Sequence, residues 1–305
     1  MDNKLKQSML FHYCTIETFC NIIKNKTIRL SDVNKTNDFM EKKWCLKHID
    51  ECIEELFFEN PVKASYDNYL DLEAIKSVVQ KLTQKFFIYI AYMDFVFCLS
   101  EEGDMLSQWR GYAQDGTGVS IAFSTEALAK IVYDNRKYLT LEKVVYSEPR
   151  QKVFIKQCIE RYYSRLYKKY IKNRQTIQLS RTDGTLNSMI KNIYSHSLKY
   201  KNPAFFEENE WRLIFNSHTP INKLLESMSP IERYSGTLQS IDFCAKNNMI
   251  VPFYDLSFNS ESDLIQEIII GPKSRVSKQD IQLILSKYNF DYKRIEIALS
   301  SLSYR

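Results

Sequence analysis

The sequence has few of the residues that interrupt regular structure. It contains only seven glycines and seven prolines among 305 residues, which argues against long flexible linkers and low-complexity segments. No apolar run approaches the roughly 18–20 residues that a membrane-spanning helix needs. The first residues, Met1 to Lys6, also lack the apolar stretch of a signal peptide. These absences predict a globular, cytoplasmic protein without a membrane partner.

Metal-binding patterns are missing as well. The seven cysteines form no CxxC pair and no Cys/His cluster with zinc-like spacing, and the four histidines do not gather with acids or cysteines. An odd, scattered set of cysteines is typical of reduced thiols in the cytosol. We therefore expect no metal cofactor.

What is present indicates one folded unit. The chain is 44% hydrophobic and 26% charged, which is ordinary for a protein that buries a core, and its net charge of +5 permits an anionic partner without requiring one. Predicted strands are spread over the whole length, and no linker separates them. We predict a single α+β domain over residues 1–305, with a central mixed or antiparallel sheet and helical insertions near 39–92 and 150–200.

Hydrophobic periodicity places the individual elements. Strands are predicted at short apolar runs bounded by turn residues: 10–13, 28–31, 95–100, 119–123, 141–147, 211–215, 250–254, 268–272 and 294–299. Helices are predicted where apolar residues recur at helical spacing: 16–24, 39–58, 71–92, a short one from 125, 151–174, 186–200 and 278–288. The stretch between Ser100 and Gly116 is expected to be a loop.

Ionisable residues occur inside or directly ahead of two of the predicted strands. His12 lies within the first apolar run, and Glu208 and Glu210 come just before the run at 211–215. Burying such groups costs free energy unless they are satisfied, so they mark candidate sites. His12 is a candidate hydrogen-bond donor to a ligand hydroxyl, or else a histidine at the core edge satisfied by backbone. Tyr13 is also a candidate for cofactor binding, although it alternates to the other face of the strand, where packing is the favoured role.

The two glutamates are a candidate catalytic pair. In an extended segment Glu208 and Glu210 would point the same way, and mutual repulsion would raise the pKa of one of them. One carboxylate would stabilise an oxocarbenium-like centre while its neighbour orients the nucleophile, as in glycoside cleavage. The alternative is a solvated acidic loop in which Arg212 is the counter-ion.

The loop after Ser100 carries further candidates for ligand binding. Ser100 would contact a ligand from the strand end, or simply form the turn. Arg110 would hold phosphate oxygens through its planar donor fork, or else pair with Asp38 or Glu41. Tyr112 would stack on a flat ring.

A basic stretch follows at residues 150–174. It has nine basic residues against one acid, interleaved with tyrosines, a composition that suits a nucleic-acid surface with Lys168, Lys169 and Lys172 as phosphate contacts. The alternative is an amphipathic helix that buries its apolar stripe, including Cys158, Ile159 and the tyrosines near them, and leaves its lysines in solvent.

Several strings together resemble an uncharacterised, mostly bacterial family known as domain of unknown function 2971. They are Leu10-Phe11-His12-Tyr13, Ile28-Arg29-Leu30-Ser31-Asp32, Asn37-Asp38, Cys98-Leu99-Ser100, Trp109-Arg110-Gly111-Tyr112-Ala113, Gly118-Val119-Ser120-Ile121-Ala122-Phe123, Glu208-Asn209-Glu210-Trp211-Arg212, Ile270-Gly271-Pro272 and Ser303-Tyr304-Arg305. That family name carries no function.

The first and the Glu-x-Glu segments also resemble ADP-ribosyltransferases. The resemblance implies that His12 binds the adenosine-side ribose of NAD and that Ser100 or Tyr112 lies beside the nicotinamide. It makes Glu210 the catalytic glutamate and Glu208 the upstream acid. It also implies that His12 and Glu210 share one cleft, on neighbouring strands of an ADP-ribosyltransferase-like sheet.

The resulting expectation is an NAD-consuming ADP-ribosyltransferase that modifies a protein or nucleic acid. The kind of family it resembles implies a toxin or phage-defence effector, with an antitoxin or defence-operon partner. Two other functions stay open: an NAD glycohydrolase with water as acceptor, and a non-catalytic module that binds nucleotide or nucleic acid.

Overall fold

The computed structural model describes most of the predicted strands. The described residues are 8–35, 44–45, 47–49, 51–52, 55, 94–166, 184–215, 238, 241–246, 248–259 and 263–304. The helix predicted at 71–92, part of the helix predicted at 39–58, and the candidate nucleic-acid contacts Lys168, Lys169 and Lys172 lie outside this part of the chain.

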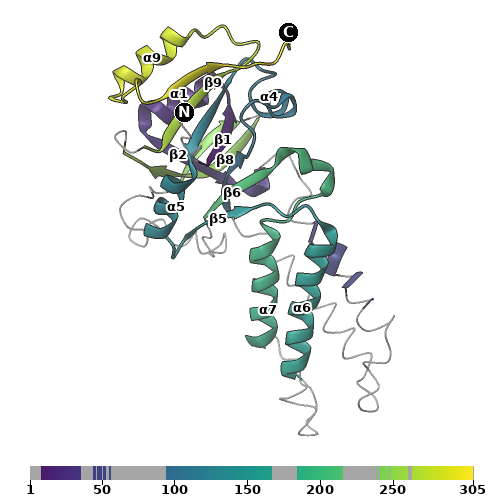
Figure 1. The fold of residues 1–305 in the computed structure, drawn as a ribbon. Coiled ribbons are helices and arrows are strands. Elements are labelled where there is room, and N and C mark those ends of the chain that lie inside the picture. Colours follow the sequence, from purple (N-terminus) through teal and green to yellow (C-terminus); the bar gives the residue numbers. More distant parts are fainter. Residues whose placement is uncertain are drawn as a thin grey trace, which may run out of the picture.

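A ten-stranded sheet forms the centre of the molecule (Figure 1). Its strands are β1 (Met9–Cys14), β2 (Thr27–Asp32), β3 (Phe95–Ser100), β4 (Val119–Ser124), β5 (Leu139–Lys143), β6 (Glu210–Phe215), β7 (Asp242–Lys246), β8 (Met249–Ser257), β9 (Ile265–Ile270) and β10 (Glu296–Leu299). The order is β10-β9-β4-β1-β3-β2-β8-β7, and β6 joins β3 to β5. Among the described strands β9 and β10 pair in parallel and the other pairs are antiparallel. A mostly antiparallel sheet with helices is thus confirmed.

Strand β3 is the branch point of this sheet. β6 pairs with all six of its residues along one edge. The other edge is shared, since β1 meets it at Ser100 and β2 meets it at Phe95 and Val96. The sheet therefore divides beside Cys98 into one wing that runs through β1 and another that runs through β2.

One face of the sheet carries the main hydrophobic core. Successive side chains of a strand point to opposite faces, and on β3 the core side takes Phe95, Phe97 and Leu99. The helices that cover this core are α1 (Ile16–Asn25), α5 (Thr125–Asp134) and α9 (Lys278–Lys287). The opposite face of β3 carries Cys98 and Ser100, and the polar residues of the candidate site lie on that side.

Local capping explains both ends of α1 and the start of α9. The Thr15 hydroxyl accepts from the backbone N–H of Thr18 at 3.1 Å to open α1, and Lys26, with φ of 54°, closes it in the left-handed conformation. Ser277 and Asp280 form a reciprocal capping box at the start of α9.

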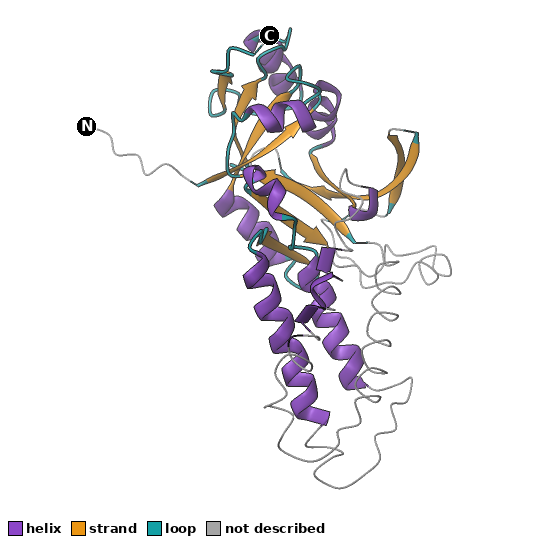
Figure 2. Cartoon of the chain, turned by 90° about the vertical axis from the view of Figure 1, so that its right-hand side faces the viewer, coloured by secondary structure: helices purple, strands orange, loops and turns teal. Residues whose placement is uncertain are grey.

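Two long helices form an arm that projects from the sheet (Figures 1 and 2). They are α6 (Glu148–Leu166) and α7 (Gly184–Ser197). The arm has a core of its own, which residues of the first insertion complete: Cys45, Ile49, Cys52, Ile155, Cys158, Ile159, Tyr162, Met189, Ile190, Ile193, Tyr194 and Tyr200. The amphipathic interpretation of the basic stretch is therefore confirmed for its described half.

The root of the arm is tied to the sheet by one buried amide. The side-chain nitrogen of Gln151 donates to the carbonyl oxygens of Val145, at 2.5 Å, and Lys201, at 3.1 Å. Its side-chain oxygen accepts from the indole N–H of Trp44 at 3.0 Å. The start of α6 is thereby fixed to the segment that leads into β6.

Several boundaries differ from the expectations. The stretch after Ser100 contains a short helix, α4 (Leu106–Tyr112), where a loop was expected. β5 ends at Lys143, and Pro149 lies in the first turn of α6, where proline needs no hydrogen-bond partner. Strand β7 was not predicted, because its residues are mostly exposed and show no apolar run.

The described helices and the cysteines are consistent with the composition. None of the described helices is both long and apolar enough to cross a bilayer. All seven cysteines are free, as expected for reduced thiols. Burial raises the pKa of the Cys14, Cys45 and Cys98 thiols, which keeps them protonated and poorly nucleophilic at neutral pH.

Gly118 and Gly111 should differ in their tolerance of a side chain. A Cβ on Gly118 would lie 2.1 Å from the carbonyl oxygen of Cys14, whereas one on Gly111 in α4 would meet nothing within 4 Å. We expect Gly118→Ala to lower the free energy of unfolding by about 3 kcal/mol through overpacking. Gly111→Ala should raise it by up to about 1 kcal/mol, because alanine favours helix. Urea unfolding checks both, and an unchanged Gly118→Ala would contradict the close approach of β1.

Candidate functional site

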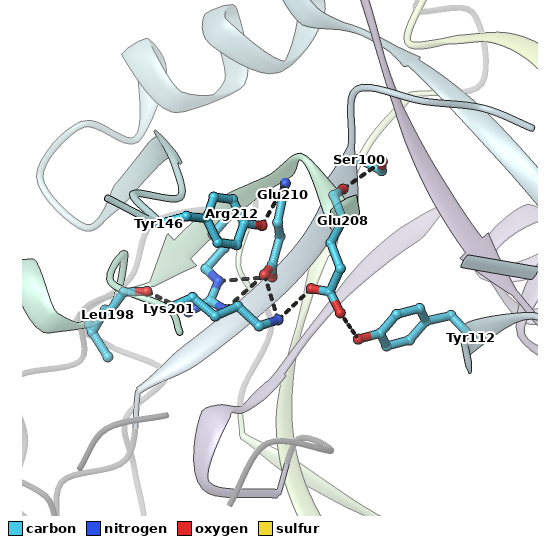
Figure 3. A network of polar contacts seen from close by, with 8 residues as sticks. All are labelled: Ser100, Tyr112, Tyr146, Leu198, Lys201, Glu208, Glu210 and Arg212. Atoms are coloured by element: carbon cyan, nitrogen blue, oxygen red, sulfur yellow. Dashed lines mark hydrogen bonds and ion pairs between the residues drawn. The ribbon is translucent and has the colours of Figure 1, made fainter. Parts of the chain in front are cut away.

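A buried ion pair lies where β6 begins (Figure 3). Arg212 donates from Nε to Oε1 of Glu210 and from Nη2 to Oε2, both at 2.9 Å. Its Nη1 also donates to the carbonyl oxygen of Leu198 at 2.6 Å. The two residues are 1% and 4% exposed, so this bidentate contact is shielded from water.

Lys201 links this pair to the second glutamate. Its ammonium group donates to Oε2 of Glu210 at 2.9 Å and to Oε2 of Glu208 at 2.5 Å (Figure 3). The Lys201 residue itself is only 5% exposed. Two carboxylates and two cations therefore meet in one small volume, and their formal charges cancel.

Burial and charge act against each other in this cluster. Burial favours the neutral form of Lys201, but the charges of Glu210 and Glu208 outweigh it and raise the lysine pKa. Burial also raises the pKa of Glu210, while the charge and hydrogen bond of Lys201 oppose that rise. Lys201 is thus a permanent cation at neutral pH, and it holds the two acids together.

The two glutamates do not belong to one extended segment. Glu208 ends a short 3-10 helix, η4 (Pro203–Glu208), and Asn209 follows in the left-handed conformation with φ of 42°. Glu210 is the first residue of β6. The expectation that they share a face through strand alternation is therefore wrong, because Asn209 turns the chain and brings both carboxylates to Lys201 by another route.

Ser100 fixes the end of β3 to this turn. Its hydroxyl donates to the carbonyl oxygen of Glu208 at 2.8 Å and accepts from the backbone N–H of Glu102 at 3.1 Å. The backbone N–H of Glu101 donates to the carbonyl oxygen of Asn209 at 3.1 Å. These contacts attach the backbone of Glu208 and Asn209 to the end of β3.

Tyr112 approaches the cluster from its open side. It is the last residue of α4 and its hydroxyl donates to Oε1 of Glu208 at 2.9 Å (Figure 3). Tyr112 is 38% exposed, and the side chain of Glu208 is 13% exposed against 6% for that of Glu210. Burial and the neighbouring Glu208 charge raise the pKa of Tyr112. Glu208 is thus the carboxylate nearer to solvent.

His12 lies outside this network. It pairs with Ile121 of β4, a core residue, and its ring lies against Phe97 with centroids 4.2 Å apart. Phe97 points to the core face of β3, so His12 lies on the face opposite Glu210. The expectation that His12 and Glu210 share one cleft on neighbouring strands is wrong. Strand β3 lies between β1 and β6, and the His12 side chain points to the core face of the sheet, opposite the face that carries Glu210.

The structure gives His12 a different contact. Its Nδ1 is 2.8 Å from the carbonyl oxygen of Cys98, at the place where the sheet divides. A carbonyl oxygen only accepts, so Nδ1 carries the proton, and Nε2 of the neutral ring is left as an acceptor rather than the expected donor. Burial lowers the pKa of His12 to about 4, although the hydrogen bond to Cys98 opposes that change.

Tyr13 and Arg110 also lie apart from the carboxylates. The Tyr13 hydroxyl donates to the carbonyl oxygen of Glu102 at 2.7 Å and accepts from the N–H of Met105 at 2.9 Å, so it supports the turn before α4. The Arg110 side chain is 65% exposed and its Nε is 4.0 Å from a carboxylate oxygen of Asp115. The alternative acidic partners considered for Arg110 fall outside the described residues.

The structure thus brings together four of the predicted residues and adds two that were missed. Ser100, Tyr112, Glu208 and Glu210 meet. Lys201 was missed because a single lysine before an Asn-Pro turn matches no sequence motif that would mark it as a site residue. Tyr146 was missed too, although its hydroxyl accepts from the backbone N–H of Glu210 at 3.1 Å. Arg212 had been considered only as a solvated counter-ion, and it is buried.

The described residues also bear on the expectations about metal binding and nucleic-acid binding. Among them, no group of three or more His, Cys, Asp or Glu side chains is arranged to hold a metal ion. On α6, Lys152 contacts Glu51 at 2.8 Å, and Lys156 forms an ion pair with Glu55. Two of the nine basic residues in the stretch 150–174 therefore already have acidic partners in the first insertion.

Comparison with known proteins supports a family relationship over the centre of the chain. The model of a family described as protein of unknown function (DUF2971) matches residues 108–213. That segment begins in α4 and ends in β6, so it contains Tyr112, Lys201, Glu208 and Glu210. No curated protein and no solved structure matches the chain.

The lowered pKa of His12 predicts a pH dependence of stability. Between pH 6.5 and about 4 the unfolded histidine binds a proton that the folded one does not, so stability should fall as pH drops through this window. We expect a loss on the order of 2–3 kcal/mol from this group. His12→Asn keeps an amide donor for Cys98 and removes the titration. Urea unfolding at several pH values should give a flatter profile for this variant, and parallel profiles would contradict the assignment.

The buried cluster should be far more sensitive than an exposed ion pair. Glu210→Gln leaves Arg212 and Lys201 with one carboxylate between them, and we expect it to cost about 3 kcal/mol or more of the free energy of unfolding. The control is Glu142→Gln, which removes an ion pair with Lys199 whose glutamate side chain is 38% exposed. That change should cost less than about 1 kcal/mol. Denaturant titrations compare the two, and equal losses would show that the cluster is not tightly shielded.

Proposed function

We propose that this chain is an NAD-consuming ADP-ribosyltransferase that modifies a protein or nucleic acid. The observation that carries the proposal is the carboxylate pair of Glu208 and Glu210, held on one lysine beside Ser100 and Tyr112. The likeness of the Glu-x-Glu segment to the catalytic strand of ADP-ribosyltransferases supports it. The same likeness favours a toxin or phage-defence setting, with an antitoxin or operon partner.

The reaction needs a carboxylate at the ribose. The bond between the ribose carbon and the nicotinamide nitrogen breaks, and nicotinamide leaves with the electron pair. Positive charge then builds on the ribose carbon, where a fixed carboxylate stabilises the transition state more than the ground state. A nucleophile of the acceptor supplies an electron pair to that carbon and loses a proton, which a second basic group accepts.

The contacts favour Glu208 as the carboxylate that approaches the substrate. Both oxygens of Glu210 are occupied by Arg212 and Lys201, and the residue is almost fully buried. Glu208 lies closer to solvent, and its two oxygens accept from Lys201 and from the Tyr112 hydroxyl at the exposed side. In this assignment Lys201, which is itself held by Glu210, orients Glu208. The assignment reverses the two roles that the resemblance implies.

Other residues complete the proposed NAD site. Tyr112 is exposed enough to lie against the nicotinamide ring, and Ser100 fixes the Glu208 backbone beneath it. Arg110, on the same helix, offers a largely solvent-exposed guanidinium to the pyrophosphate. His12 is left out of this site, because it faces the other side of the sheet.

A non-catalytic nucleotide-binding module is the second candidate. It is favoured by the saturation of Glu210, whose lone pairs already serve two buried cations. An NAD glycohydrolase would use the same carboxylates with water as acceptor. The paired lysines of α6 give less support to a nucleic-acid surface on the described part of the arm.

Glu208→Gln tests the proposal. The amide keeps the shape but loses the charge, so NAD binding measured by calorimetry should persist while nicotinamide release falls by about two orders of magnitude or more. Glu142→Gln is the matched control and should leave turnover unchanged. Transfer of labelled ADP-ribose to lysate components separates transferase from glycohydrolase.

Two outcomes would overturn the assignment. Full turnover by Glu208→Gln would remove Glu208 from the chemistry. NAD binding without any nicotinamide release by the parent chain would favour the binding module, and no NAD binding at all would exclude NAD as the ligand.

A further inference from the structure

The segment after β10, residues 300–304, is attached to the start of helix α4 through Asp104. This closing segment donates three hydrogen bonds to the Asp104 carboxylate: Ser300 Oγ at 2.6 Å, the Ser301 N–H at 2.7 Å and Ser301 Oγ at 2.8 Å. The indole N–H of Trp109, from inside α4, donates a fourth at 2.7 Å. One carboxylate therefore joins two segments that are almost 200 residues apart in sequence.

The closing segment also contacts the turn after α4. The Tyr304 hydroxyl donates to Asp115 at 2.7 Å, and Lys273 pairs with the same carboxylate at 2.7 Å. Leu302 packs on the cluster that includes Trp109. The helix is thus held at both ends by residues 300–304 and their neighbours.

Helix α4 depends on such attachments. It has seven residues, well below the about 12–15 at which an isolated helix becomes stable, and no side chain caps its start at Met105. Gly111 weakens it further, since glycine favours the unfolded chain. Ser107, Arg110 and Gly111 are exposed, and a Cβ at Gly111 would meet nothing within 4 Å.

We propose that Asp104 is a positioning residue for the carboxylate site and that the closing segment acts through it. By anchoring residues 300–304 to α4, Asp104 sets the place of Tyr112, the last residue of that helix, on Glu208. The inference rests on the proposed function for its catalytic consequence. The geometric part, from the closing segment to Tyr112, stands without it.

The test removes the side-chain donors of the closing segment. The double variant Ser300→Ala with Ser301→Ala deletes both hydroxyls, and Ser303→Ala is the matched control, because Ser303 is exposed and makes no hydrogen bond in the described structure. The first readout needs no substrate. Tyrosine labelled with carbon-13 at Cζ gives an NMR signal for Tyr112, assigned by its disappearance in Tyr112→Phe.

The expected result is a moved or broadened Tyr112 signal in the double variant and an unchanged one in Ser303→Ala. Adding Gly111→Ala, which strengthens α4 without new contacts, should restore the signal. An unmoved Tyr112 signal in the double variant would overturn the proposal, as would a movement that Ser303→Ala reproduces.

The second readout is turnover. We expect kcat of nicotinamide release to fall between about 10- and 100-fold in the double variant, since displacing a catalytic group by about 1 Å costs that order. KM for NAD should change less. In a Tyr112→Phe background the serine substitutions should have no further effect, because they act through the same hydroxyl.

Additive effects in that cycle would overturn the positioning role and leave a structural one. Failure of the proposed function would give a different result from failure of the positioning role. In that case no nicotinamide is released by any variant, and the Tyr112 signal still responds to the closing segment.

Discussion

The bidentate contact between Arg212 and Glu210 is the constraint on which the candidate site depends. Removing two charges from water costs several kcal/mol for each ion, and only good geometry with every donor satisfied offsets that cost. Arg212 adds to the two bonds with Glu210 a third, from Nη1 to the carbonyl oxygen of Leu198. The residues that lead from α7 into β6 must therefore be in place before the pair is stable, and Lys201 arrives with them.

The sheet supplies the other half of the site by register alone. Because Ser100 pairs with Glu210 across β3 and β6, the end of one strand meets the start of the other. Ser100 then holds the backbone of Glu208, and the backbone N–H of Glu101 holds the carbonyl oxygen of Asn209 in the turn. The position of the Glu208 backbone is thus set by the register of β3 and β6, and the position of its carboxylate is set by the charge cluster. Both are needed to place Glu208.

Sequence reasoning identified most strands and the Glu-x-Glu segment because both depend on local patterns. Apolar runs gave β3, β4 and β6 nearly to the residue. It misplaced His12, since alternation along a strand says which residues share a face but not which face meets a distant glutamate. Lys201 was not found because its role comes from two carboxylates that surround it in space. The short helix α4 escaped because tertiary contacts, rather than helical periodicity, hold it.

The pairing of β2 with β8 has a consequence for how the chain reaches its native state. Arg29 in β2 forms an ion pair with Asp255 in β8, so the two strands join segments 226 residues apart. During synthesis the edge of β2 that pairs with β8 stays unpaired until residues 249–257 have left the ribosome. Such long-range pairing slows folding, and a waiting edge strand is a template for association with other chains.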